Sequence, residues 1–243
     1  RARFVRADHS TLEGNLALAA EIKDSVDQVD VLVNNVGGLI PRRETTANGV
    51  EMTLALNLRA PVVLTEQLRP VFARDGLVVN VASDAFRRFE GDPFDGLDDA
   101  DDYEPFKAYA RAKLLLVLAS LAQARQLEPE GMRVVAVNPG PAWTPGTQVL
   151  NPDCLPGPKV MWPIVRLVQR SRSADQAARV LTRVAVASDD VMGAGVTGCY
   201  VTARGKVRAL GALDGDLERQ ERAMAAAWSL GHEAEPVHGG CDG

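Results

Sequence analysis

The chain has 243 residues, of which 46% are hydrophobic and 24% charged, and its net charge is −5. This composition is typical of a globular protein, and the acidic balance argues against nucleic acid as a partner. The longest apolar run, residues 114–119, is far shorter than the roughly 18 residues that a membrane span needs. Three scattered cysteines indicate a reducing, cytoplasmic compartment.

Strands and helices are expected to alternate along the chain. Residues 4–7 predict a short strand, and Ser10 with Glu13 forms a capping pattern for the helix that follows. Further strands are expected at 29–33, 77–81, 133–137 and 196–202. Further helices are expected at 49–72, 105–126, 173–187 and 214–230, with irregular structure at 146–172.

The strands are apolar on both faces, as in a parallel sheet that helices cover on both sides. The pattern predicts an α/β protein with a Rossmann-type three-layer αβα sandwich. We expect one domain over residues 1–230 and a disordered tail over 231–243. Polar motifs follow four strands: "DHS", "NNVGG", "ASD" and "NPGPAWT". Because ligands of such sheets bind beyond the carboxyl ends of the strands, these motifs predict the site.

Tyr109 and Lys113 lie four residues apart in an expected helix and so share one face. A nearby cation lowers the pKa of a phenol, which is ordinarily about 10. Ser83, at the end of a strand, could hold a carbonyl oxygen while Tyr109 delivers a proton to it. No side chain supplies hydride, so this pattern implies a nicotinamide cofactor. On spacing alone, a Tyr–Lys pair is more often a solvated helix face.

Asn57 lies four residues before Pro61 in the expected helix 49–72. Proline has no N–H, so the carbonyl of Asn57 loses its helical partner and the helix kinks. The freed carbonyl could hold a water molecule that links Lys113 to solvent. A kink without any functional role is the alternative interpretation.

Together these residues closely resemble the short-chain dehydrogenase/reductase family, from Asp8 to at least Thr144. The resemblance implies that the family's Asn-Ser-Tyr-Lys tetrad is formed by Asn57, Ser83, Tyr109 and Lys113. It implies cofactor contacts at Asp8, His9, Asn34, Asn35, Gly37, Tyr109, Lys113, Pro139, Gly140, Ala142 and Thr144. The cofactor implied is NADP, by family analogy, or NAD.

The long acidic loop before Tyr109 and the segment "GCYVTARGKVRALGALDGDLERQ" look like the retinol dehydrogenase-like branch of this family. That likeness implies reduction or oxidation of a small-molecule carbonyl or alcohol of lipophilic character. The substrate is expected to enter under residues 142–172, which are rich in proline and apolar side chains. The sequence leaves open whether the protein is a homo-oligomer.

The family's glycine-rich phosphate turn follows no strand of this sequence. In the family's sheet order the strand at 4–7 would be the third, so we expect an N-terminally truncated sheet with the first two strands missing. Residues 4–7 would then lie apart from the other strands, beside an open slot, or pair with 29–33. The alternative to an enzyme is a non-catalytic fragment without productive cofactor binding.

Two further features, the acidic residues between 90 and 104 and the dispersed histidines, do not indicate a functional site. The acidic residues between 90 and 104 lack the spacing of a calcium loop and indicate a solvated segment. The three histidines are too dispersed to form a metal site, and a pair such as His238 and Cys241 in the tail is insufficient for one. No metal is therefore expected.

Overall fold

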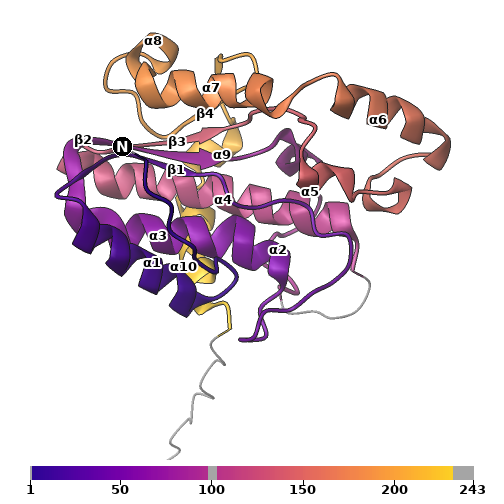
Figure 1. Cartoon of the computed structure of the whole chain (residues 1–243), viewed down its shortest axis with the longest axis horizontal. Helices are drawn as coiled ribbons and strands as arrows, with labels where there is room; N and C mark the ends of the chain where they lie inside the picture. The colour runs from indigo at the N-terminus through magenta and orange to yellow at the C-terminus, as the bar shows by residue number, and fades with distance from the viewer. Residues whose placement is uncertain (1, 98–102, 232–243) are drawn as a thin grey trace, which may run out of the picture.

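The computed structural model describes residues 2–97 and 103–231 of the chain. Within these ranges, five strands form one sheet in the order β1-β2-β3-β4-β5, parallel except for β5 (Figure 1). They are β1 (Val29–Asn34), β2 (Phe72–Val81), β3 (Arg133–Val137), β4 (Cys199–Val201) and β5 (Val207–Arg208). Helices cover both faces of the sheet, which confirms the predicted αβα architecture.

One face of the sheet is covered by α1 (Leu12–Ser25), α3 (Ala60–Leu68), α4 (Pro105–Leu127) and α10 (Leu217–Ser229). The short α2 (Met52–Leu54) and a π-helical turn (Ala55–Arg59) lead into α3. The opposite face is covered by α7 (Ala174–Val186) and α8 (Ser188–Met192). The remaining helices are α5 (Pro145–Gln148), α6 (Trp162–Arg170) and α9 (Ala212–Gly215).

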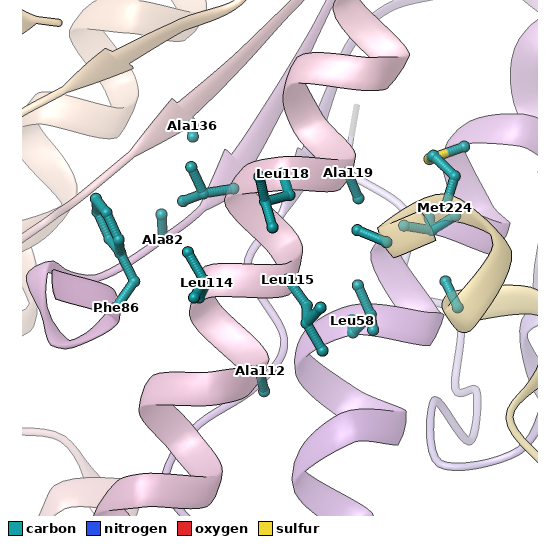
Figure 2. Close-up of a cluster of buried hydrophobic side chains, with 14 of the residues drawn as sticks. Leu58, Ala82, Phe86, Ala112, Leu114, Leu115, Leu118, Ala119, Ala136 and Met224 are labelled. Atoms are coloured by element: carbon teal, nitrogen blue, oxygen red, sulfur yellow. The ribbon is translucent and has the colours of Figure 1, made fainter. Parts of the chain in front are cut away.

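Alternate strand residues build two core layers, because successive side chains of a strand point to opposite faces. Toward α7 lie Leu77, Val79, Val135, Val137 and Val201, packed against Val180 and Val184. Toward α4 lie Val78 and Val134, packed against Ala124 and Leu127. A larger cluster joins α4, α10 and the π-helical turn; Figure 2 shows Leu115, Leu58 and Met224 in it.

Helix α7 leaves the outermost strand of the sheet uncovered. Val31 and Val33 of β1 pair with Leu77 and Val79 of β2, so they lie on the α7 face. They are nevertheless 37% and 39% exposed, whereas Leu77 is 2% exposed. Leu32, on the other face of β1, packs against residues of α1 and α3. One face of β1 is thus an open apolar surface.

The predicted strand at 4–7 is wrong: these residues carry no strand and pair with none of the strands of the sheet, and Phe4 is 89% exposed. A strand requires a hydrogen-bonded neighbour, which the pattern of residues cannot supply. The first of the two expected arrangements, isolation of 4–7 beside an exposed β1, is the one observed. The helix that follows is capped by Thr11, which accepts from the N–H of Gly14, and not by Ser10.

Two other expectations need correction. The segment 146–172 is not irregular throughout, since α6 occupies nine of its residues. The helix expected at 49–72 begins at Met52, and a 3-10 turn follows Leu68. Residues 98–102 of the acidic loop and 232–243 of the predicted tail lie outside the described residues. Within the described ranges, no helix has the length and apolarity needed to cross a bilayer.

Candidate active site

The parallel register brings the carboxyl ends of four strands to one edge of the sheet. Asn34 lies beside Asn80, Val81 beside Val137, and Val137 beside Val201. The segments that follow these strands begin at residues 35, 82, 138 and 202. The structure therefore gathers three of the four predicted polar motifs at this edge, and "DHS" follows no strand.

Ser83 and Tyr109 meet at this edge from β2 and α4. Ser83 begins a 3-10 turn (Asp84–Arg88), and its Oγ accepts a hydrogen bond from the N–H of Ala85 at 3.2 Å. Burial raises the pKa of the Tyr109 phenol, and a hydrogen bond with the Ser83 side chain offsets part of this increase. Because the phenol stays protonated, the pair can offer two hydroxyl donors to one acceptor atom.

Lys113 follows Tyr109 by one helical turn and is only 4% exposed. Its Nζ donates a hydrogen bond to the carbonyl of Val81 at 2.7 Å, two residues before Ser83. The same atom lies 5.7 Å from the centre of the Tyr109 ring. Burial lowers the pKa of Lys113 to about 7, because the apolar surroundings disfavour the charged form.

The expected lowering of the Tyr109 pKa by Lys113 is not what this structure shows. The direction is reversed, because burial of the phenol has the largest effect and Ser83 provides the only opposing one. The Lys113 ammonium is directed to the end of β2 and over the aromatic ring. Burial also disfavours the charged form of Lys113, which weakens its effect on the phenol.

Asn57 is fully buried in the π-helical turn and ties this turn to the loop after β1. Its Nδ2 donates to the carbonyls of Gly38 at 2.9 Å and Thr53 at 2.8 Å, and its Oδ1 accepts from the N–H of Gly38 at 3.0 Å. Gly37 has a φ of +142°, and a Cβ there would lie 2.5 Å from Asn57 Oδ1. "NNVGG" and Asn57 thus form one unit.

The kink expected at Pro61 takes the form of the π-helical turn. The N–H of Ala60 bonds to the carbonyl of Ala55, five residues back, and Pro61 has no N–H to offer to Asn57. Single π-turns inside helices are frequent at functional sites. The side chain of Asn57 already bonds to Gly38 and Thr53, and the water molecule at its backbone carbonyl stays a prediction.

The predicted cofactor residues at the start of the chain make local contacts. Asp8 is exposed, and its Oδ1 accepts from the N–H and the hydroxyl of Ser10 at 2.9 and 2.7 Å. These hydrogen bonds lower the pKa of Asp8. His9 Nδ1 lies 2.9 Å from Oδ1 of Asn15, a buried residue of α1.

Asn34 and Asn35 differ in their surroundings. Asn34 donates to Oδ1 of Asn80 at 2.8 Å and to the hydroxyl of Thr65 at 3.2 Å, so its amide joins β1 to β2 and α3. Asn35 is exposed at the carboxyl edge. Asn34 therefore stabilises the fold through its hydrogen bonds, whereas the side chain of Asn35 is accessible to a ligand at the carboxyl edge.

The "NPGPAWT" segment forms a turn over the end of β3. Asn138 Oδ1 accepts from the N–H of Gly140 at 2.8 Å, and Gly140 has a φ of +78°. Pro139 and Ala142 are half-buried within this turn. Thr144 caps α5 through a capping box with Thr147. Arg172 lies close against Gly140, where a Cβ would clash with its guanidinium.

Asp84 lies in the predicted motif "ASD", but the sequence indicated no role for it. Its Oδ2 accepts from Nδ2 of Asn138 at 2.7 Å, and its Oδ1 accepts from the hydroxyl of Tyr200 at 2.9 Å. Burial and the nearby carboxylate raise the pKa of Tyr200. Asp84 thus ties together the ends of β2, β3 and β4. Its position next to Ser83 is the only sequence signal that could have found it.

Comparisons with known proteins agree with this arrangement. A family model described as enoyl-(acyl carrier protein) reductase matches residues 1–201. The chain is 30% identical over 152 residues to an uncharacterised oxidoreductase of Schizosaccharomyces pombe, covering 57% of this chain and 44% of that protein. It is 31% identical over 140 residues to retinol dehydrogenase 13 of Homo sapiens, covering 56% of this chain and 42% of that protein.

A solved structure of angucycline C-6 ketoreductase LanV with bound NADP superposes with a TM-score of 0.59 at 21% identity, covering 84% of this chain and 74% of that one. With the fold, the family model and these relatives in agreement, the chain belongs to the short-chain dehydrogenase/reductase family. The matches span less than half the length of the two curated relatives.

Proposed function

We propose that this protein is an NAD(P)-dependent oxidoreductase that interconverts a lipophilic ketone or aldehyde and the corresponding alcohol. The observation that carries the proposal is that Ser83, at the end of β2, lies beside the buried Lys113, whose Nζ bonds to the carbonyl of Val81 and lies 5.7 Å from the centre of the Tyr109 ring, at the carboxyl edge of the sheet. Members of the family to which the chain belongs include the ketoreductase named above, whose structure contains NADP.

The roles of the side chains follow from their positions. Tyr109 remains protonated at neutral pH because burial raises its pKa, so it can give its proton to a carbonyl oxygen. Ser83 donates a hydrogen bond to the same oxygen and stabilises the negative charge that grows there. Lys113, with a pKa of about 7, can return a proton toward Tyr109, and Asn57 holds the "NNVGG" loop in place.

The residues present fit the nicotinamide end of a dinucleotide. Asn35, Gly37 and the turn 139–144 follow strands β1 and β3 at the carboxyl edge, and Lys113 reaches the end of β2 there, one helical turn after Tyr109. A bound cofactor would supply or accept the hydride at this edge. No glycine-rich turn joins a strand of this sequence directly to a helix, so the chain itself offers no such turn to the pyrophosphate.

An apolar substrate is supported by the segment that follows the Pro-Gly turn. Trp143, Leu150 and Leu155 are half-buried there and carry no charge. Val160 and Met161, which we expected in the same lining, are 81% and 45% exposed on the outside of the molecule. We therefore propose that the substrate enters beneath residues 142–155 and not beneath the whole segment 142–172.

The test is a carbonyl panel of graded polarity, assayed with NADPH and with NADH by loss of reduced-cofactor absorbance. We expect turnover to be highest for lipophilic ketones and aldehydes. A preference for small charged acids would contradict the substrate class. Turnover that survives replacement of both Ser83 by Ala and Tyr109 by Phe would contradict the site.

A non-catalytic protein of the same fold is the second candidate. The observation in its favour is the uncovered face of β1, where Val31 and Val33 are 37% and 39% exposed. Fluorescence titration of this chain with NADPH and NADH separates the two candidates. Saturable, tight binding excludes the non-catalytic candidate, and absence of binding at millimolar cofactor supports it.

A further inference from the structure

Helix α6 is oriented with its polar side toward the protein and its apolar side toward solvent. Arg166 and Val165 are half-buried and Gln169 is buried, with no hydrogen-bond partner for its Oε1 among the described residues. The outer face of α6 consists of Val160 and Met161, just before the helix, with Ile164, Leu167 and Val168. Their exposed fractions are 81%, 45%, 53%, 68% and 49%. Surface helices of globular proteins show the opposite arrangement.

Contacts on the inner side hold α6 in this orientation. The guanidinium of Arg166 lies 4.4 Å from the centre of the Trp143 ring, and its Nη1 donates to the carbonyl of Thr147 at 3.3 Å. The N–H of Trp143 donates to the carbonyl of Arg172 at 2.9 Å. Figure 1 shows α6 at the margin of the molecule, and these contacts of Arg166 and Arg172 leave its apolar side chains exposed there.

The charge of this segment differs from that of the rest of the chain. Residues 154–172 contain four basic side chains and no acidic one, whereas the whole chain has 32 acidic and 27 basic residues. Lys159 and Arg170 are exposed at the two ends of α6. Lys159 also pairs with Asp153. An apolar strip with a cation at each end complements an anionic lipid surface.

We propose that the outer face of α6 binds the protein to an anionic membrane surface. A strip of five side chains matches the shallow insertion of an interfacial helix, which enters the bilayer by roughly 5–10 Å. It is too small for a stable dimer, because standard interfaces use about 20–30 residues from each partner. Lys159 and Arg170 then lie at the level of the lipid headgroups.

The experiment is co-sedimentation of the purified protein with vesicles of phosphatidylcholine alone and of phosphatidylcholine mixed with phosphatidylglycerol. We expect binding to the mixed vesicles, weakened by added salt. The double variant Ile164→Glu/Leu167→Glu should lower the partition coefficient at least about tenfold, since both side chains leave the bilayer. Val186→Glu, at an 82% exposed valine of α7, is the matched control and should bind like the parent.

A second pair of variants tests the cations. Lys159→Glu/Arg170→Glu should abolish the preference for mixed vesicles. The proposal is overturned if the parent does not bind mixed vesicles, or if the Ile164→Glu/Leu167→Glu variant binds as well as the parent. Parent self-association that disappears in this variant, without vesicle binding, would instead assign the face to a second copy. Circular dichroism checks folding, and Leu167→Ser replaces the double variant if that variant unfolds.

Discussion

Tyr109 is the residue on which the proposed chemistry depends most directly. Tyr109→Phe removes the proton donor and keeps the buried ring, so packing against Lys113 is preserved. We expect kcat of the intact protein to fall by at least about 100-fold, the usual size of a general acid–base contribution. Steady-state kinetics with a lipophilic carbonyl measures this change. Near-normal kcat in the variant would remove Tyr109 from the mechanism, and an unchanged melting temperature would show that the fold is intact.

Lys113 links the site to the pH dependence of stability. Its pKa is lowered to about 7 in the folded protein, while the unfolded chain binds the proton up to about pH 10. The unfolded state therefore binds more protons between these values, so the free energy of unfolding should increase with pH in this window. From pH 7 to pH 9 the increase from this group should approach about 2 kcal/mol.

Urea unfolding of the parent and of Lys113→Met at both pH values measures the effect. The methionine variant keeps a buried chain of similar shape but has no proton to bind. We expect the pH-dependent gain to disappear in it, so that the stability of the parent relative to the variant falls by about 2 kcal/mol from pH 9 to pH 7. Parallel pH dependence of parent and variant would show that the Lys113 pKa is not lowered.

Gly37 is required by the close approach of Asn57. Gly37→Ala places a Cβ 2.5 Å from Asn57 Oδ1 at a φ of +142°. We expect a loss of about 1–3 kcal/mol in the free energy of unfolding, since the buried Asn57 amide loses partners. Gly38→Ala is the matched control, because nothing lies within 4 Å of a Cβ there. Equal effects of both substitutions in urea unfolding would argue against the Asn57 contact.

Among the elements, α4 does two things at once. Its first turns carry Tyr109 and Lys113, and its middle packs against the π-helical turn and α10 around Leu115 (Figure 2). Leu115 is fully buried, so Leu115→Ala should lower the free energy of unfolding by about 2–5 kcal/mol. Leu217→Ala, at a 52% exposed position of α10, should cost much less. Thermal unfolding of both variants decides whether this packing holds α4.

At the scale of the whole molecule, the uncovered face of β1 is the surface most prone to self-association. Val31 and Val33 expose apolar surface at an edge strand, and such edges pair with other chains. Val31→Lys/Val33→Lys should reduce concentration-dependent self-association of this chain, measured by sedimentation velocity. Val186→Lys/Leu217→Lys adds the same charge on two helices and should change self-association less. If Val186→Lys/Leu217→Lys reduced self-association more than Val31→Lys/Val33→Lys, the association surface would lie elsewhere.

Much of the fold could be predicted from local pattern. The strand 133–137 was predicted with its observed bounds, and β1 and α4 to within a residue. These segments are strongly apolar, so their pattern is clear whether they are buried, as in β3, or partly exposed, as in β1. Residues 4–7 have the same apolar pattern but no neighbouring strand, and therefore the prediction failed there. The irregularity predicted around Pro61 coincides with the π-helical turn at Ala55–Arg59, and the bend of the helix axis stays a prediction.

The sequence by itself determined the alternating αβ order and the placement of Ser83, Tyr109 and Lys113, since these depend on neighbours a few residues apart. Only the tertiary structure decided the electrostatics and the contacts of the site. Burial reverses the expected pKa change of Tyr109, Asn57 binds Gly38, Asp84 joins Asn138 to Tyr200, and α6 turns its apolar face outward. The pKa change, the hydrogen bonds and the orientation of α6 all depend on which distant segments of the chain pack against a side chain and exclude water from it. The residues next to that side chain in the sequence do not determine this packing.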